Sequence, residues 1–150
     1  MPKPLSIGIA FTAILLALLL IPLDGQISNT IFTFIGRFHP LLLHLLIGGL
    51  MALFVMEIMD SLYPKLNLGA ACYVLLWFSI ITILPTAILG FLLATNASYD
   101  DELLNIHKWL GWITALSCCW LYYFKVNSPQ NGTRRYKSFL GFNVLFLSLT

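Results

Sequence analysis

Charged side chains are scarce in this chain. Asp, Glu, Lys and Arg make up 9% of its 150 residues, whereas 59% are hydrophobic and the mean hydropathy is +0.90. An ordinary soluble domain carries roughly 25% charged residues. With so few charges a soluble domain could not cover its surface, so the composition predicts an integral membrane protein. The length allows one bundle, residues 1–150, rather than several domains.

Motifs for several kinds of chemistry are also missing. Cys72, Cys118 and Cys119 all lie in apolar runs and form no CxxC or CxxCH pattern. Neither a zinc knuckle nor a covalent c-type haem is therefore indicated, and we expect these cysteines to act as small packing residues. The chain has no Gly-rich phosphate loop, no GxSxG and no alternation of basic and aromatic residues. Nucleic acid is not an expected partner.

Long apolar runs dominate what remains. Four of them suit transmembrane helices across a hydrocarbon core of about 30 Å. The first, with Lys3 ahead of it, is longer than the 7–15 apolar residues of a signal peptide, so we take it as a retained span. A last run of 12 residues is too short to span, and we expect it to begin a fifth helix that continues further. The predicted fold is all-α, with spans at about 5–23, 39–59, 69–94 and 103–124 and a partial one at 139–150.

Three local features add detail to this prediction, namely a proline, a short helix and a pair of acidic residues. Pro85 interrupts the third span, since proline removes a backbone hydrogen bond and clashes with the preceding turn. Thr86 and Gly90 follow it, so we expect this third of the helix to be irregular and closely packed. A short helix is predicted after Ser28-Asn29-Thr30. At the far end of the second span, Glu57 and Asp60 are expected to reach the headgroups and pair with Lys65.

The basic residues predict the orientation. A cytoplasmic N-terminus places six Lys and Arg inside and two outside, in line with the positive-inside rule. We therefore expect a multi-pass membrane protein with all three histidines on the outer side. The inside residues are Lys3, Lys65, Lys125, Arg134, Arg135 and Lys137, and the outside ones are Arg37 and Lys108.

Three histidines stand near the outer ends of two spans. At 1.5 Å per residue His44 and His107 lie at a matching depth of ~6–8 Å. His44 shares its helix stripe with Gly48, and His107 shares its stripe with Gly111. Small residues mark the interior of membrane bundles, so both histidines are predicted to point inward. His39 lies about 140° around the helix from His44 and is predicted to face the interface.

Inward imidazoles at one depth suit the axial ligands of a non-covalent haem b. The predicted cofactor site is His44 and His107 as iron ligands, with Gly48 and Gly111 making room and His39 as a secondary candidate. A copper or zinc ion is an alternative, although two histidines leave a closed zinc site short of ligands. The remaining alternative is that the histidines only form hydrogen bonds with backbone carbonyls, water or the acidic residues 100–102.

Two motifs resemble a known family. The run FHPLLLHLLIG at residues 38–48 is similar to the HPLLVHFPIG signature of a bacterial membrane-domain family of unknown function, and IHKWLGW at 106–112 is similar to its second motif. The resemblance covers roughly residues 33–125. That family usually has a proline where this chain has Leu46, so we expect a straighter helix here. The resemblance implies a domain that often precedes c-type cytochrome modules in one longer polypeptide.

The leading functional hypothesis is an electron-transfer module. Haem b near the outer leaflet would pass electrons from quinol to an outer c-type cytochrome or respiratory complex. The bundle itself would be embedded in the lipid bilayer. The alternative is a cofactor-free bundle that anchors a periplasmic partner or its own C-terminal extension. Catalysis by this chain alone is not expected, because Glu57 lies at the opposite leaflet from the histidines and no nucleophile stands beside them.

Overall fold

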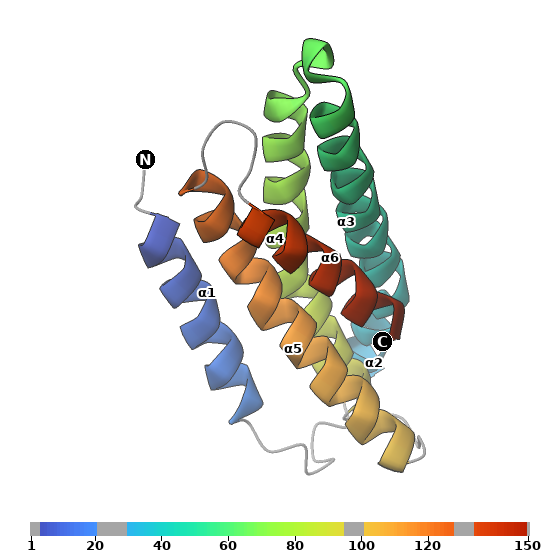
Figure 1. Cartoon of the computed structure of the whole chain (residues 1–150). Coiled ribbons are helices and arrows are strands. Elements are labelled where there is room, and N and C mark those ends of the chain that lie inside the picture. The colour runs from blue at the N-terminus through green and yellow to red at the C-terminus, as the bar shows by residue number, and fades with distance from the viewer. Residues whose placement is uncertain (1–3, 21–29, 95–100, 128–133, 150) are drawn as a thin grey trace.

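A computed structural model describes residues 4–20, 30–94, 101–127 and 134–149, and every regular element in those ranges is a helix. Lys3, Ser28, Asn29 and residues 21–23 of the first predicted span lie outside them. In chain order the helices are α1 (Pro4–Leu19), α2 (Thr30–Gly36), α3 (His39–Leu62), the 3-10 turn η1 (Pro64–Leu66), α4 (Gly69–Ala94), α5 (Asp101–Val126) and α6 (Arg134–Leu149) (Figure 1).

The apolar runs correspond to these helices. The predicted span 69–94 coincides with α4, and α3 begins at His39 with Pro40 in its first turn, where a missing N–H costs nothing. The short helix predicted after Ser28-Asn29-Thr30 is α2. The last helix begins at Arg134, ahead of the predicted residue 139. The prediction followed the apolar run only, and the first turn of this helix is polar.

The helices form a bundle with two distinct ends. Figure 1 shows η1, the end of α5 and the start of α6 at one end, with α2 and the start of α5 at the other. The long helices α3 and α4 pack side by side, α1 packs against α5, and α5 also contacts α4 and α6. Between α3 and α4 the chain reverses at η1, where Asn67 adopts a left-handed conformation with φ 49°.

Buried apolar side chains from α3, α4, α5 and α6 fill the interior. All three cysteines are buried free thiols, as their apolar surroundings predicted. Gly49 lets α3 approach α4 closely, because a Cβ there would lie 2.9 Å from Oγ of Ser79. The core includes Leu46, Leu50, Leu53, Leu76, Ile80, Ile83, Leu121 and Leu140.

The outside of the bundle is apolar as well. Large hydrophobic side chains such as Leu41, Val74 and Ile81 are exposed along α3 and α4. Soluble monomers rarely expose contiguous apolar surfaces of this kind. Two helical stretches, Thr30–Leu62 and Gly69–Ala94, are long and apolar enough to cross a membrane, and Leu5–Ala17 is a shorter apolar helix.

Candidate functional site

A cavity of about 420 Å³ opens between α3, α4 and α5, near the end of the bundle that carries α2. Its walls are mainly apolar, with Leu43, Ile83 and Phe91 among them. A few polar groups converge on it. They are His39, Thr86, His107, Lys108 and Thr114. An apolar cavity with a few convergent polar groups is the usual form of a cofactor or small-molecule site.

His39 is held in one orientation by α4. Its Nδ1 lies 2.8 Å from the backbone carbonyl oxygen of Thr86. Because a carbonyl oxygen only accepts, Nδ1 carries the proton, and Nε2 of the neutral ring keeps a free lone pair. Nε2 is buried, and within the described residues it has no hydrogen-bond partner. A buried nitrogen of this kind is available for coordination.

Gly90 makes this orientation possible. A Cβ at position 90 would lie 2.8 Å from Cε1 and 3.0 Å from Nδ1 of His39, so no larger residue fits without moving the ring. Thr86 lies on the same stretch of α4, and its hydroxyl donates to the carbonyl of Thr82 at 2.6 Å. The prediction that the part of α4 following Pro85 is closely packed is confirmed at Gly90, but the predicted irregularity is wrong, because α4 continues as one α-helix from Gly69 to Ala94.

His107 comes from α5 and faces the same cavity. Its ring centroid lies 6.1 Å from that of His39, and the two ring planes are at 90°. Gly111, one turn further along α5, also lines the cavity. The inward placement predicted for His107 and Gly111 is therefore confirmed.

His44 and Gly48 lie elsewhere. His44 is exposed, and its Nδ1 donates to the carbonyl of Pro40 in its own helix at 2.6 Å. Gly48 is exposed too, and a Cβ there would meet nothing within 4 Å. The orientations predicted for His44 and His39 are thus wrong and have to be exchanged. His39, and not His44, lies beside His107.

The error has a physical origin in α3. Small residues around Gly48 suggested an interior face, but Gly48 is exposed, and the buried face of α3 carries Gly49 and a stripe of larger side chains at alternating steps of three and four. His39 is the first member of that stripe, and its last member is a buried glutamate. The stripe is His39, Leu43, Leu46, Leu50, Leu53 and Glu57. This spacing was the available signal for placing His39 in the interior.

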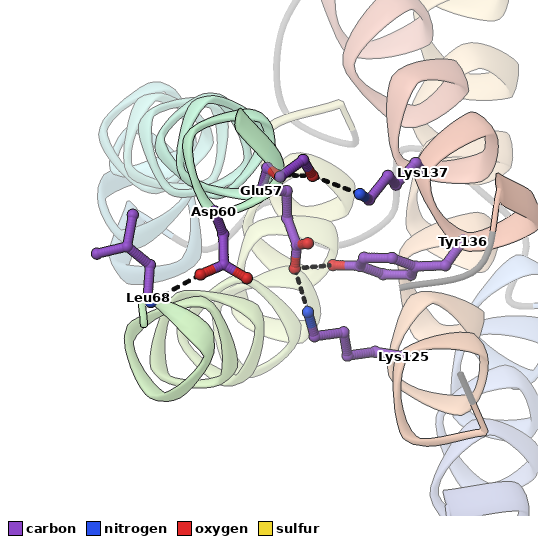
Figure 2. A network of polar contacts seen from close by, with 7 residues as sticks. Glu57, Asp60, Leu68, Lys125, Tyr136 and Lys137 are labelled. Atoms are coloured by element: carbon purple, nitrogen blue, oxygen red, sulfur yellow. Dashed lines mark hydrogen bonds and ion pairs between the residues drawn. The ribbon is translucent and has the colours of Figure 1, made fainter. Parts of the chain in front are cut away.

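A buried polar cluster at the η1 end was not predicted from the sequence. Figure 2 shows Lys125 and Tyr136 pointing at the carboxylate of Glu57. Oε1 of Glu57 forms an ion pair with Nζ of Lys125 and accepts a hydrogen bond from the Tyr136 hydroxyl at 3.1 Å. Only 4% of Glu57 and 8% of Lys125 is exposed. Nζ of Lys125 also lies 4.9 Å from the ring centroid of Tyr136, a cation–π contact.

The expected partners of Glu57 and Asp60 are corrected by this cluster. Glu57 pairs with Lys125 instead of Lys65, which lies on the exposed turn η1. Asp60 accepts a hydrogen bond from the backbone N–H of Leu68 at 2.8 Å, so it closes the turn between α3 and α4 (Figure 2). The first contact joins two helices and the second crosses the turn between two helices. The spacing of residues along one helix could therefore not identify either of them.

Metal binding by carboxylate or thiolate clusters is not supported in the described ranges. No group of three or more His, Cys, Asp or Glu side chains there is arranged to hold a metal ion. A closed zinc site needs four protein ligands. The pair His39 and His107 offers two imidazoles to the cavity.

Comparison with known proteins assigns no family. No family model, no curated protein and no solved structure matches this chain. The resemblance of residues 33–125 to the HPxxxH membrane-domain family stays a prediction that depends on its two motifs. Function is therefore inferred from the geometry of the cavity.

Proposed function

We propose that this chain is a membrane module of a bacterial electron-transfer system that binds haem b in the cavity, where His39 and His107 would hold the iron. The observation that carries the proposal is the contact between Nδ1 of His39 and the carbonyl of Thr86. Histidine ligands commonly donate their other ring N–H to a backbone carbonyl, which fixes the tautomer and aims the free nitrogen.

The separation of the two rings supports a shared iron. A metal–nitrogen bond is about 2 Å long. The centre of an imidazole lies about 1 Å from its nitrogen, given ring bonds near 1.3–1.4 Å. Imidazoles that shared one iron would have their ring centroids no more than about 6 Å apart, and the centroids of His39 and His107 lie 6.1 Å apart.

The surroundings of the two rings support a flat, apolar group. Within the described residues α3 and α5 share at most a marginal backbone contact, which leaves room between their histidines. Gly90 and Gly111 keep side chains out of the cavity. Lys108, which also lines it, supplies a positive charge that can pair with the carboxylates of haem. When bound, the haem supplies one-electron transfer.

The proposed topology has α1, α3, α4 and α5 as membrane spans, α6 as a partial fifth and a cytoplasmic N-terminus. The η1 end carries Lys65 in η1 itself, Lys125 in the last turn of α5, and Arg134, Arg135 and Lys137 at the start of α6. This excess of basic residues fits the cytoplasmic side. The histidine pair then lies near the periplasmic surface of the inner membrane. There it would exchange electrons with an outer c-type cytochrome or respiratory complex, and quinol is the proposed donor.

An optical spectrum tests this function. The full chain, extracted in detergent from cells supplied with haem precursor, should give a reduced-minus-oxidised difference spectrum with Soret and α bands. His39→Ala should abolish the bands, while His44→Ala, a change at the exposed histidine of the same helix, should preserve them. A wild-type protein without any haem spectrum would contradict the proposal and favour the cofactor-free anchor. Equal loss of the bands in the two variants would contradict the assignment of His39 as an iron ligand.

A further inference from the structure

A second cavity, of about 210 Å³, lies between α3 and α6 at the η1 end of the bundle. The accessible surface of its wall is apolar and includes Phe54, Ile58, Leu62 and Leu140, while Glu57, Ser61 and Lys137 border it with the apolar parts of their side chains. We propose that this groove binds a membrane phospholipid with an anionic headgroup. The proposal rests on the membrane location that belongs to the proposed function, but not on the haem.

The groove has an unbalanced positive charge beside it, which favours an anionic ligand. The carboxylate of Glu57 is already paired with Lys125, so it does not balance the neighbouring cation, Lys137. In the part of the chain that the structure describes, Lys137 forms no ion pair, and its Nζ donates to the hydroxyl of Ser61 (Figure 2).

The start of α6 adds to this positive charge. Arg134 and Arg135 occupy its first turn, both are exposed, and that turn holds no acidic residue. Arg134, Arg135 and Lys137 therefore place three cations within four residues at the N-terminal end of α6. The positive end of the helix dipole also favours a negative charge there. Basic pockets between membrane helices on the cytoplasmic side are typical sites for anionic lipid headgroups.

The apolar wall indicates a lipid and not a free anion. Ile58 and Leu62 are 44% and 67% exposed, and they continue the groove along α3 toward the middle of the candidate span. A headgroup phosphate at the rim of the groove would accept a hydrogen bond from Nζ of Lys137, which Ser61 holds in place while its own hydroxyl donates to the carbonyl of Glu57. An acyl chain would then run over Ile58 and Phe54 and cover apolar surface that water would otherwise contact.

Thermal unfolding of the detergent-solubilised full chain tests the site. Phosphatidylglycerol should raise the unfolding midpoint, phosphatidylcholine should do so much less, and glycerol phosphate, which has the headgroup but no acyl chain, should have no effect. Lys137→Gln should increase the half-saturating phosphatidylglycerol concentration on the order of fivefold, the scale expected for one basic residue near an anionic surface. Lys65→Gln removes an exposed cation at the same end but outside the groove, and it should leave that concentration unchanged.

Three outcomes would overturn the proposal. Equal stabilisation by the two lipids would show that the headgroup charge is not recognised. Equal effects of Lys65→Gln and Lys137→Gln would show a diffuse surface charge instead of a site. Stabilisation by glycerol phosphate as strong as that by the lipid would indicate a site for soluble phosphate. A protein that lacks a haem spectrum but responds selectively to phosphatidylglycerol would refute the proposed function alone and leave this site standing.

Discussion

Nδ1 of His39 donates to the backbone carbonyl of Thr86 at 2.8 Å, a hydrogen bond that joins two helices across 47 residues of sequence. This single contact determines which ring nitrogen stays free and where it lies. Since the acceptor is a backbone atom, no side-chain substitution at position 86 removes it directly. The residue that controls the contact is Gly90, against which the ring is packed.

Gly90→Ala should therefore disturb the histidine pair without unfolding the bundle. The added Cβ would lie 2.8 Å from Cε1 of His39, so the ring has to move, and such overpacking costs about 1–3 kcal/mol. We expect less haem per protein and a lower unfolding midpoint. Gly48→Ala is the matched control, because its Cβ enters open space and alanine favours a helix by about 1 kcal/mol. Equal haem content in the two variants would contradict the assigned role of Gly90.

The fold was more predictable from the sequence than the site. Hydrophobic runs located the helices because a membrane span needs an uninterrupted apolar segment, and α4 coincides with its predicted range. On α5, where His107 and Gly111 share a stripe, the small-residue rule gave the right face. It failed on α3, because Gly48 is exposed while Gly49 and the leucines lie on the buried face, and the predicted orientations of His39 and His44 were exchanged.

The second polar cluster was hidden for a different reason. Glu57 and Lys125 are 68 residues apart, and Glu57 and Tyr136 are 79 apart. Periodicity within one helix says which residues share a face, but it does not say which face of another helix lies opposite. A charged residue at the end of an apolar run usually reaches the headgroups, and only the packing of α3, α5 and α6 reveals a buried pair.

Glu57→Gln should strongly destabilise the protein. The change leaves the ammonium of Lys125 buried without its counter-charge, and breaking a buried ion pair from one side typically costs about 3–5 kcal/mol. Replacing both partners, with Glu57→Gln and Lys125→Met, should cost less than the sum of the two single changes. Unfolding in mixed micelles measures all three variants. A loss below about 1 kcal/mol in the single variants, as for an exposed pair, would contradict the buried arrangement.

Tyr136→Phe isolates the hydroxyl group in the same cluster. The ring under Lys125 is retained, while the hydrogen bond to Oε1 of Glu57 is lost. Hydrogen bonds to charged groups contribute about 1.5–3 kcal/mol, so the free energy of unfolding should fall by roughly that amount. Tyr63→Phe, at an exposed position beyond α3, provides the comparison and should change stability little. If the two variants were equally stable, the hydroxyl would not contribute to holding α6 against α3.

Gly36→Ala tests how α2 is attached to the bundle. A Cβ at position 36 would lie 2.9 Å from the backbone N and 3.1 Å from Cα of Leu93. Backbone atoms cannot turn aside as a flexible side chain does, so α2 has to move away from α4 at a cost of about 1–3 kcal/mol. Gly69→Ala, where a Cβ would meet nothing within 4 Å, is the matched control. Amide hydrogen exchange should show faster exchange in α2 for Gly36→Ala only. Because only two residues separate α2 from His39, the same variant should also weaken haem retention. Unchanged exchange in α2 would show that the close approach to Leu93 does not hold this helix in place.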